Sequence, residues 1–469
     1  MTRLLLGLLG CGTPATDTDT DVVVETEPLD AVVSLAEAPF TVRGTVSSSG
    51  LSLGSGRALA IGDVDGDVVD DLVIGATYGN EVCAGWPTGT SDFAAARTCL
   101  QGEAPGDYAG SALVAGMDLD GDTLGDLVIG AVGVNAGGTD RGAVYIVRGP
   151  ISSGALADAW ATYAGDADLD GAGTTLGAGD VSGDGVNDLV IGAPGNDEGG
   201  QGGGVVYVVF GPLTPGAHAL RDSSARIVGT EGALRHGSDT GGDALGTSAA
   251  VVGDLDGDGL DDLAVGAGGN DTLVPNGGLA AVFAGPLGTG RLDLTMADAR
   301  LVGTNPQGFA GEPVARAGDV NGDGYDDLLV SSNAAAPQRT WLVRGPIAGD
   351  GNLAEAAATE FRLDHDDGLG WAMAAADLNG DGLSDVVLGA PWNDLANVDA
   401  GAAFALFAPV PPGVYSMDDA PRTWLGEVAG DGAGSALAVG DLENDGAIDV
   451  VIGAPFATLG GGTVYGVAP

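Results

Sequence analysis

The chain has no lysine and only 16 arginines against 66 Asp and Glu residues, so its formal net charge is −50 over 469 residues. A surface this acidic repels nucleic-acid phosphates and anionic lipid headgroups, which excludes binding to either by charge attraction. The acidic residues do not form a disordered tail, because 44% of the residues are hydrophobic and the Asp residues recur at fixed places between apolar segments. The pattern predicts bound cations that offset part of this charge.

Histidine, cysteine and long apolar runs are also scarce. The three histidines, His218, His236 and His365, stand in no metal or nucleophile motif, so the sequence presents no catalytic set. Downstream of the N-terminus, no stretch approaches the roughly 18 apolar residues that a membrane-spanning helix needs. Cys83 and Cys99 are predicted to form a disulfide in an oxidising compartment, the alternative being two buried free thiols.

The N-terminus, "MTRLLLGLLGCG", places a short apolar run before a Gly-Cys pair. It resembles a bacterial lipoprotein signal, in which "LLGC" ends at the acylated cysteine, although its six-residue apolar run is shorter than usual. A chance Leu run is the alternative. The resemblance implies a signal peptide at residues 1–10, lipidation of Cys11, and export to the outer membrane or cell surface, with the lipid as the only membrane attachment. Residues 11–38, rich in Thr, Asp and Pro, are predicted to be a flexible linker.

One segment, typified by "DLDGDGLDDLAVGA" from Asp254, recurs seven times at intervals of 55 to 74 residues. Counted from its first Asp, oxygen-bearing side chains stand at positions 1, 3, 5 and 9. These are the predicted metal ligands: Asp63, Asp65, Asp67 and Asp71; Asp118, Asp120, Asp122 and Asp126; Asp180, Ser182, Asp184 and Asp188; Asp254, Asp256, Asp258 and Asp262; Asp319, Asn321, Asp323 and Asp327; Asp377, Asn379, Asp381 and Asp385; Asp441, Glu443, Asp445 and Asp449.

Alternating oxygens on a tight loop can converge, and converging carboxylates repel each other unless a cation lies between them. Ca²⁺ is favoured because it accepts six to eight oxygens in a tolerant geometry, whereas Mg²⁺ requires a stricter octahedron. An EF-hand is excluded, because position 12 is apolar, as at Val265, and lies in a strand. The sequence predicts up to seven Ca²⁺ ions. Copies two and three fit least well, with Thr123 instead of Gly at position 6 and Ser182 at position 3. The alternative is a set of Asx-rich turns without metal.

Each unit contains a short apolar strand, the Asp-rich loop, a buried strand such as "DVVIGAP", and two further strands. Four strands repeated seven times, with 86 Gly and 22 Pro to make the turns, predict an all-β, seven-bladed β-propeller over residues 39–469. The strand-like segment "FTVRGT" precedes the first loop, and the chain ends after a third-type strand. The N-terminal strand is therefore predicted to complete the last blade and close the ring.

These units resemble FG-GAP repeats, the calcium-binding blades of the integrin α-subunit head. The resemblance rests on the loops and on "GAP" at Gly192–Pro194, Gly389–Pro391 and Gly453–Pro455, and Phe-Gly itself is mostly absent. It implies that ions rigidify one face while partners bind the opposite face. The implied function is a non-catalytic binding or adhesion module for an extracellular or envelope protein or a glycan. Alternatives are an enzyme acting on extracellular polysaccharides or lipids, and a scaffold for envelope assembly.

Two features are candidate contacts for a partner: the insertion at residues 231–246, and the loops around five tryptophans. The competing interpretation of the tryptophans is that they fill blade cores. The five are Trp86, Trp160, Trp371, Trp392 and Trp424.

Overall fold

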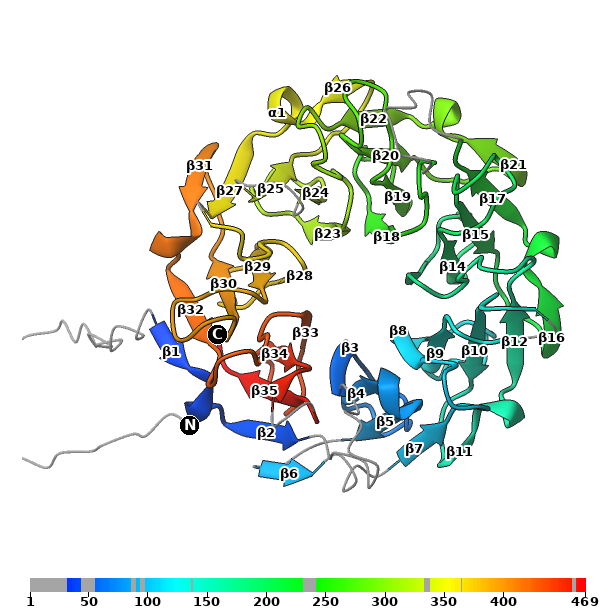
Figure 1. Cartoon of the computed structure of the whole chain (residues 1–469), viewed down its shortest axis with the longest axis horizontal. Helices are drawn as coiled ribbons and strands as arrows, with labels where there is room; N and C mark the ends of the chain where they lie inside the picture. Colours follow the sequence, from blue (N-terminus) through cyan, green and yellow to red (C-terminus); the bar gives the residue numbers. More distant parts are fainter. Residues whose placement is uncertain are drawn as a thin grey trace, which may run out of the picture. The chain divides into compact units, whose positions relative to one another are not determined.

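The structure is a computed structural model that describes residues 32–43, 55–85, 90–92, 98–135, 138–230, 242–332, 338–363, 365–457 and 461–469. These residues belong to one compact unit, residues 31–469, in which seven sheets follow one another around a ring (Figure 1). The predicted signal peptide, Cys11 and most of the predicted linker lie outside the described residues. The seven-bladed all-β propeller is confirmed.

Each blade contains four antiparallel strands, and the first strand of each lies nearest the centre of the ring (Figure 1). In blades 1 to 3 the four strands are β3 (Ser55–Gly62), β4 (Asp71–Ala76), β5 (Glu81–Gly85) and β7 (Thr98–Gln101); β8 (Ala109–Met117), β9 (Asp126–Ala131), β10 (Ala143–Val147) and β12 (Ala161–Ala164); and β13 (Leu176–Gly179), β14 (Asp188–Ala193), β15 (Val205–Val209) and β17 (Ala225–Val228).

Blades 4 to 7 repeat the pattern, and the last takes its fourth strand from the N-terminal segment. Their strands are β18 (Ser248–Gly253), β19 (Asp262–Ala267), β20 (Leu279–Phe283) and β22 (Ala299–Val302); β23 (Val314–Gly318), β24 (Asp327–Ser332), β25 (Gln338–Val343) and β27 (Thr359–Leu363); β28 (Met373–Ala376), β29 (Asp385–Ala390), β30 (Ala402–Leu406) and β32 (Arg422–Leu425); and β33 (Ala436–Gly440), β34 (Asp449–Ala454), β35 (Thr463–Val467) and β2 (Phe40–Arg43).

A fifth strand, which the sequence did not predict, pairs in parallel with the outer edge of every blade. It comes from the connection in the next repeat, so each blade is bound to its neighbour by backbone hydrogen bonds as well as by side-chain packing. In chain order around the ring these strands are β11 (Gly154–Ala155), β16 (Gly216–Ala219), β21 (Gly290–Asp293), β26 (Gly351–Asn352), β31 (Gly413–Ser416), β1 (Val32–Ser34) and β6 (Thr90–Asp92).

Short helical turns follow several of these fifth strands and direct the chain into the next fourth strand. They are η1 (Leu35–Glu37), η4 (Leu156–Asp158), η5 (Leu220–Asp222), η6 (Leu294–Met296), α1 (Leu353–Ala356) and η7 (Met417–Asp419), while η2 (Thr77–Gly79) follows β4. Within the described ranges, no helix combines the length and apolarity needed to cross a membrane.

The hydrophobic core lies between neighbouring blades, where the second strands of blades 1 to 6 are buried along their whole length and that of blade 7 is buried except at Asp449. The Gly of the "IGA" motif is needed there because a Cβ at Gly75 would overlap the carbonyl oxygen of Gly110 in the next blade. The same overlap recurs between Gly453 in blade 7 and Gly56 in blade 1. The glycine of this motif is therefore required because neighbouring blades approach each other too closely there for a side chain.

The N-terminal segment closes the ring twice. As predicted, β2 pairs antiparallel with β35 and becomes the fourth strand of blade 7. In addition, β1 pairs in parallel with β32 of blade 6, and Leu35 is fully buried beside Trp424. The prediction that the linker extends to residue 38 therefore does not hold for residues 32–37, which form β1 and η1. Five of residues 32–38 are apolar, but this short segment shows no period that would reveal which of them packs into the core.

Cys83 on β5 and Cys99 on β7 are directly paired across the two strands and form a disulfide. It links the third and fourth strands of blade 1.

Candidate metal sites

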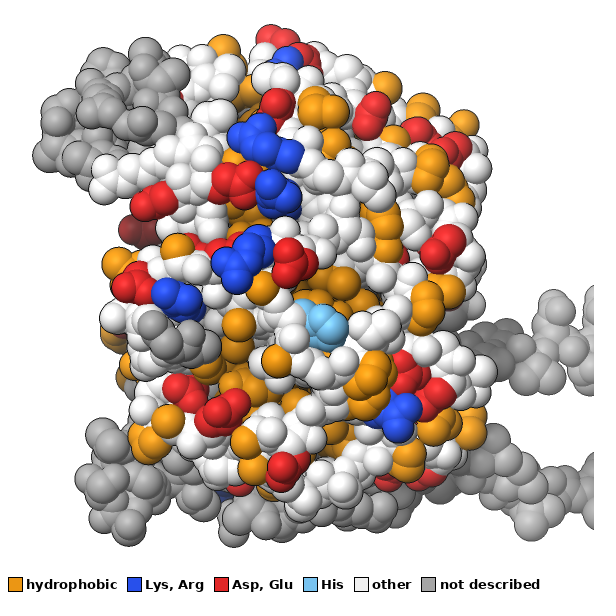
Figure 2. Space-filling model, turned by 90° about the vertical axis from the view of Figure 1, so that its right-hand side faces the viewer, with side chains coloured by type: hydrophobic (Ala, Val, Ile, Leu, Met, Phe, Trp, Pro, Cys, Tyr) orange, Lys and Arg blue, Asp and Glu red, His pale blue; other side chains and the backbone are white. Residues whose placement is uncertain are grey.

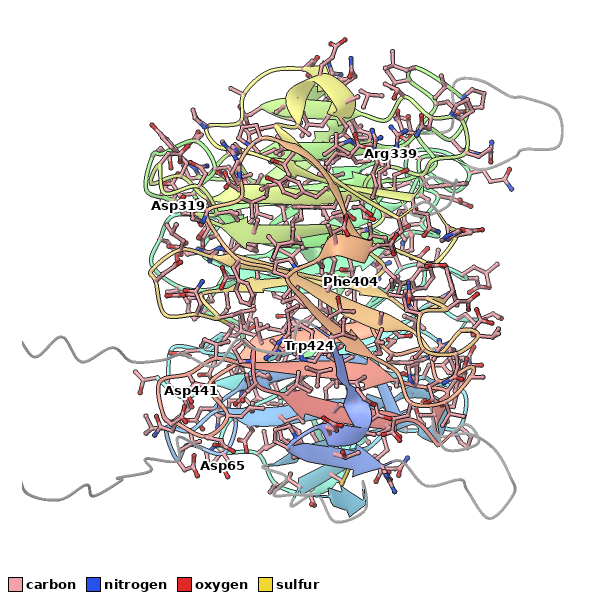
Figure 3. The ribbon with its side chains drawn as sticks, turned by 90° about the vertical axis from the view of Figure 1, so that its left-hand side faces the viewer. Asp65, Asp319, Arg339, Phe404, Trp424 and Asp441 are labelled. Atoms are coloured by element: carbon pink, nitrogen blue, oxygen red, sulfur yellow. A yellow bond between two sulfur atoms is a disulfide. The ribbon has the colours of Figure 1, made fainter. Side chains whose placement is uncertain are left out.

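Seven loops, called Asp loops 1 to 7 here, join the first strand of each blade to its second: residues 63–71, 118–126, 180–188, 254–262, 319–327, 377–385 and 441–449. Because all seven occupy the same place in the repeat, they lie on one face of the ring. Asp65, Asp319 and Asp441, from three different loops, stand along the same side (Figure 3). The segments after the second strands lie on the opposite face.

The carboxylate at position 1 organises each loop. In Asp loop 4, Asp254 accepts hydrogen bonds from the backbone N–H groups of Gly257 at 2.6 Å, Asp258 at 3.0 Å and Gly259 at 2.8 Å. The Asp258 carboxylate accepts from Leu260 N–H at 2.9 Å. These short-range bonds explain why Asp recurs at positions 1 and 5 even before any ion is considered.

The carboxylate at position 9 is buried in loops 1 to 6 and partly buried in loop 7, and it fixes the loop to the blade. Asp262 is fully buried, and it accepts from the backbone N–H of Leu255 at 2.8 Å and of Gly285 at 2.9 Å. Burial, and then the charges of Asp256 and Asp254, raise its pKa to about 6. The same causes raise the pKa of Asp71, Asp126 and Asp449 to about 6, and that of Asp188, Asp327 and Asp385 is also raised.

Three Asp loops bring three carboxylate oxygens within 4.8 Å of one another: Asp63, Asp65 and Asp71; Asp118, Asp120 and Asp122; Asp254, Asp256 and Asp262. Two oxygens on opposite sides of a Ca²⁺ ion, each about 2.4 Å away, stand about 4.8 Å apart. Oxygen donors, like charges and this spacing together fit a hard divalent cation. In each of loops 1, 2 and 4, the three converging carboxylates would hold one such ion.

The other four loops differ in the side chain at position 3. Ser182 Oγ lies 3.4 Å from Asp180 and 3.5 Å from Asp188, so loop 3 brings three oxygen-bearing side chains together. In loops 5 and 6 the amides of Asn321 and Asn379 approach the position-9 carboxylates at 3.3 Å and 3.5 Å. Loop 7 carries Glu443, and its described carboxylates do not form a group of three within 4.8 Å.

Asp loop 2 contains its own cation. The Arg148 guanidinium, at the end of β10, lies 3.1 Å from Asp120 and 3.7 Å from Asp122, and its other face stacks over Trp160 at 5.5 Å. The guanidinium offsets part of the charge that a metal ion would otherwise neutralise. Loop 2 is therefore expected to bind Ca²⁺ more weakly than loops 1 and 4, although its three carboxylates converge.

Position 6 adopts a left-handed backbone in all seven loops. Gly occupies it in loops 3 to 7, with φ of 89° at Gly259, but loops 1 and 2 have Val68 at 72° and Thr123 at 74°. A left-handed residue with a Cβ is destabilised by about 1–2 kcal/mol, and most of all a β-branched one.

Replacing Val68 by Gly is expected to raise the free energy of unfolding by about 0.5–1 kcal/mol, because relief of the left-handed strain exceeds the extra entropy that Gly loses on folding. Val68 is 83% exposed, so the change removes little packing. Gly259→Val at the same position of loop 4 is the matched reverse change and should destabilise. Chemical denaturation of the two variants measures both effects, and equal stability of Val68→Gly and the parent chain would contradict the strain.

Removing divalent cations should make stability depend on pH in a defined direction. A carboxyl whose pKa rises from 3.8 in the unfolded chain to about 6 on folding contributes stability that is present below pH 3.8 and lost as the pH rises through 6. In EDTA, the thermal midpoint is therefore expected to fall between pH 4 and pH 6.5. A midpoint that rises over this interval would show that the buried carboxyls do not dominate.

A second set of buried acids, which the sequence reasoning missed, lies on the opposite face. Each is the Asp of an Asp-x-x-Gly pattern just before a first strand, and this repeated spacing was the available signal. Asp170 accepts from the backbone N–H of Ala167 at 2.7 Å and from the amide of Asn196 at 3.1 Å, which joins two loops. The set comprises Asp107, Asp170, Asp243, Asp367 and Asp431.

Arginines on the fourth and fifth strands pair with acids, and basic and acidic side chains lie next to each other on this side of the ring (Figure 2). Glu198 accepts two hydrogen bonds from Arg226 and lies 3.4 Å from Arg291. Arg300 pairs with Asp350. These exposed pairs leave the strongly negative net charge in place and add little stability individually.

The tryptophans that the sequence offered as partner contacts differ in their exposure to solvent. Trp424 is buried, and Trp160 is half-buried against the core, whereas Trp371 and Trp392 are exposed. Trp86, His236 and residues 231–241 of the insertion lie outside the described residues. His218 stacks on Tyr163, with ring centroids 4.8 Å apart, and Nε2 lies 2.9 Å from the Thr214 carbonyl oxygen. Neither described histidine joins a carboxylate group that could hold a metal.

Parts of this ring of seven blades with Asp-rich loops match known repeat families. A model of the FG-GAP-like repeat matches residues 319–388, and a model of the FG-GAP repeat matches residues 172–209 and 245–283. The chain therefore contains FG-GAP repeats, as the sequence predicted.

Known proteins similar to this chain include integrin alpha subunits and phosphatidylinositol-glycan-specific phospholipases D. The chain is 33% identical over 190 residues to integrin alpha-PS5 of Drosophila melanogaster, which covers 37% of this chain and 16% of the integrin. It is 28% identical over 189 residues to phosphatidylinositol-glycan-specific phospholipase D of Dictyostelium discoideum, covering 35% of this chain and 20% of the enzyme. The chain thus spans a fifth or less of these relatives.

A solved structure of BBS1N in complex with ARL6DN, soaked with mercury, aligns with a TM-score of 0.49 and 11% identity, over 93% of this chain and 98% of the other. A similarity at this level does not establish a shared function.

Proposed function

We propose that this protein is a calcium-stabilised propeller that acts outside the cell as a non-catalytic binding or adhesion module for a protein or a glycan. The observation that carries the proposal is the division between the two faces of the ring. Convergent carboxylates occupy one face, while exposed aromatic residues, Trp371 and Trp392 among them, occupy the other. Ions bound at the first face would rigidify the blades that present the second.

A binding screen in two metal states tests this proposal. The whole protein is applied to panels of immobilised glycans and envelope proteins in millimolar Ca²⁺, and again in EDTA. The expected result is a saturable partner in Ca²⁺ that is weakened in EDTA. Failure to bind any member of broad panels while the protein is folded and saturated with Ca²⁺ would count against a binding module.

We further propose that the protein is exported and anchored through a lipid on Cys11. The disulfide between Cys83 and Cys99 supports an oxidising compartment, and the "LLGC" sequence supports acylation. Mass spectrometry of the N-terminal peptide from the host envelope should find a diacylglyceryl group on Cys11, and Cys11→Ser should release the protein into the soluble fraction. An unmodified Cys11 in membrane-derived protein would contradict the anchor.

An enzymatic role is a second candidate, because one of the similar proteins is a phospholipase D. The match covers only 20% of that enzyme. Turnover of phosphatidylinositol-glycan, phospholipid or polysaccharide substrates by the purified protein, abolished by a point substitution on the propeller, would replace the binding proposal with a catalytic one. A stoichiometric protein that co-purifies in mild detergent would instead favour a scaffold.

A further inference from the structure

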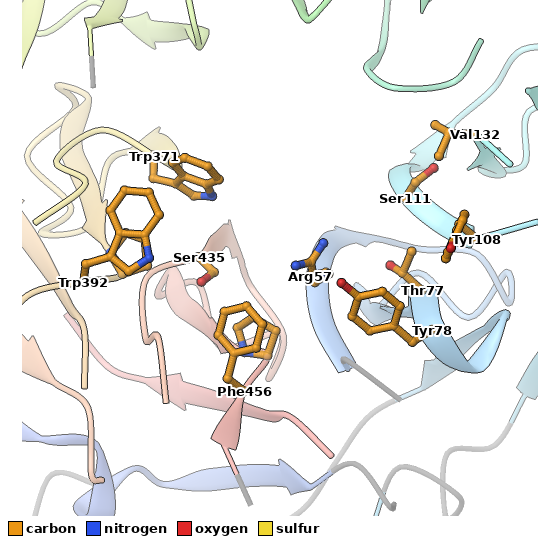
Figure 4. A pocket seen from close by; sticks show the side chains of 12 residues that line it. Arg57, Thr77, Tyr78, Tyr108, Ser111, Val132, Trp371, Trp392, Ser435 and Phe456 are labelled. Atoms are coloured by element: carbon orange, nitrogen blue, oxygen red, sulfur yellow. The ribbon is translucent and has the colours of Figure 1, made fainter. Parts of the chain in front are cut away.

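The exposed aromatic residues of the propeller are gathered at one place. In the described part of the chain, five aromatic side chains are 37–48% exposed, and all five line one depression of about 610 Å³ (Figure 4). Scattered exposed apolar residues are ordinary, but a concentrated aromatic patch marks an interaction site. The five are Tyr78, Tyr108, Trp371, Trp392 and Phe456.

The depression lies on the face opposite the Asp loops. Tyr78 follows β4 and Trp392 follows β29, so both stand at the far ends of strands that begin at an Asp loop. Arg57 and Trp371 stand at or before the starts of β3 and β28, which run toward those loops. The lining comes from blades 6, 7, 1 and 2, and Trp371 and Trp392 contact each other edge to face at 4.9 Å.

The fold itself does not require these aromatic residues. Tyr78, Trp392 and Phe456 occupy one and the same position of the repeat, two residues after the "GA" that ends the second strand. Blades 2, 3 and 4 carry glycine there and form the same strands and turns. The glycines are Gly133, Gly195 and Gly269.

A second repeat position is changed in the same sector. The residue after the inter-blade Gly at the start of each first strand is Ser or Thr in blades 2, 3, 4 and 7, namely Ser111, Thr174, Thr247 and Ser435. Blades 1 and 6 have Arg57 and Trp371 instead, and both line the depression. Blade 5 carries Glu312 at this position, outside the depression. Both positions thus accept small residues in several blades, and large side chains from both positions converge in this depression.

Arg57 gives this depression a local charge opposite to that of the chain. Its guanidinium lies 4.9 Å from the ring centroid of Tyr78 and 5.6 Å from that of Phe456, and both rings position it. Among the described residues, no carboxylate lies within ion-pair distance of it, and no Asp or Glu lines the depression. In a chain with 66 acidic residues, an arginine without an acidic partner is available for an anionic group on a ligand.

We propose that this depression binds a saccharide that carries a carboxylate, such as an oligosaccharide ending in a uronic acid. The inference rests on the proposed binding function and names its site and ligand class. The C–H faces of sugar rings stack on Trp371, Trp392 and the tyrosines, which buries apolar surface. The hydroxyls of Ser111 and Ser435 donate to the carbonyl oxygens of Gly173 and Gly432, so their oxygen atoms can accept hydrogen bonds from sugar hydroxyls. Arg57 pairs with the carboxylate. A single carboxylate suits the site better than a polyanion, because the net charge of −50 repels a polyanion.

Isothermal titration of the whole protein in saturating Ca²⁺ tests the proposal with matched probes. One probe is a trisaccharide ending in glucuronic acid, and the other is its carboxyl-reduced neutral counterpart. The acidic probe is expected to bind about tenfold more tightly, the effect of one charge-assisted contact. Arg57→Gln should remove this difference, while Trp392→Ala should weaken both probes.

Two variants serve as controls. Arg291→Gln removes a rim guanidinium outside the depression, and Met296→Ala removes an exposed apolar side chain elsewhere. Both should bind the probes like the parent chain, and all variants should keep the same Ca²⁺-dependent thermal midpoint, which shows that they are folded.

The proposed site is overturned if the parent chain binds the two probes with equal affinity or binds neither. It is also overturned if Arg57→Gln and Trp392→Ala both leave the affinity for the probes unchanged, or if the parent chain prefers an acidic peptide to the acidic sugar. If a partner from the wider panels still binds in Ca²⁺ and is indifferent to Arg57→Gln and Trp392→Ala, the binding module stands and only this site fails. If no partner binds at all, both fail.

Discussion

Chelation with EDTA is expected to lower the thermal midpoint of this protein strongly, and millimolar Ca²⁺ should restore it where Mg²⁺ does not. An ion that binds only the folded state adds about 2.7 kcal/mol per site at a concentration 100-fold above its Kd. Loops 1 and 4, each with three carboxylate oxygens within 4.8 Å, would together add about 5 kcal/mol, and loop 2, where Arg148 weakens binding, would add less. Differential scanning calorimetry in the three conditions measures the effect.

Single-site variants assign that stability to particular loops. Asp256→Ala removes a ligand from loop 4, whereas Asp256→Asn keeps an oxygen of the kind that Asn321 and Asn379 present at the same position of loops 5 and 6. The Ala variant should lose more of the Ca²⁺-induced rise than the Asn variant, with similar midpoints in EDTA. Asp158→Ala, an exposed acid outside the loops, controls for net charge.

The absence of any difference between EDTA and Ca²⁺ would mean that the Asp loops are turns held by their own hydrogen bonds, such as those from Gly257 and Gly259 to Asp254. The metal-dependent part of the proposed function would then fail. Equal stabilisation by Mg²⁺ and Ca²⁺ would retain the metal sites but reject the preference for Ca²⁺.

Leu35→Ala is expected to destabilise the propeller by about 3 kcal/mol, in the range of buried Leu to Ala substitutions. Leu35 is fully buried and packs in the hydrophobic cluster that contains Trp424 of blade 6 and Tyr465 of blade 7. Its loss creates a cavity where the N-terminal segment holds the last two blades together. Equilibrium unfolding in urea, in saturating Ca²⁺, gives the difference in free energy.

Val32→Ala is the matched control, because Val32 lies in the same short segment but is 58% exposed. It should change the stability by less than about 0.5 kcal/mol. If Leu35→Ala were as mild as Val32→Ala, residues 32–38 would behave as the linker that their composition suggested, and the second closure of the ring would be contradicted.

The repeated loops made most of the fold predictable. Seven copies of one segment, each followed by a buried strand such as Asp262–Ala267, predict the number of blades because each copy can form only one unit. The closing role of residues 40–43 followed from a missing fourth strand at the C-terminal end. The fifth strands could not be predicted, because pieces such as Gly154–Ala155 are two to four residues long and carry no pattern of their own.

The candidate metal ligands were predictable for a similar reason, since side chains on one tight loop are close in sequence as well as in space. The sequence did not show that Arg148 approaches Asp120 and Asp122 of loop 2, because the contact spans 28 residues. It also named Trp371 and Trp392 together with the buried Trp424, because exposure depends on what packs over a residue and not on the residue itself.

The sequence alone determined the repeat, the alternation of apolar strands with oxygen-rich loops, and the net charge, because each is written in local spacing and residue type. Only the tertiary structure decided which residues from distant repeats meet. Closure of the ring brings blades 6, 7, 1 and 2 together, so Trp392, Phe456 and Arg57, from opposite ends of the chain, line one depression. Such a site depends on long-range packing, which local spacing does not encode.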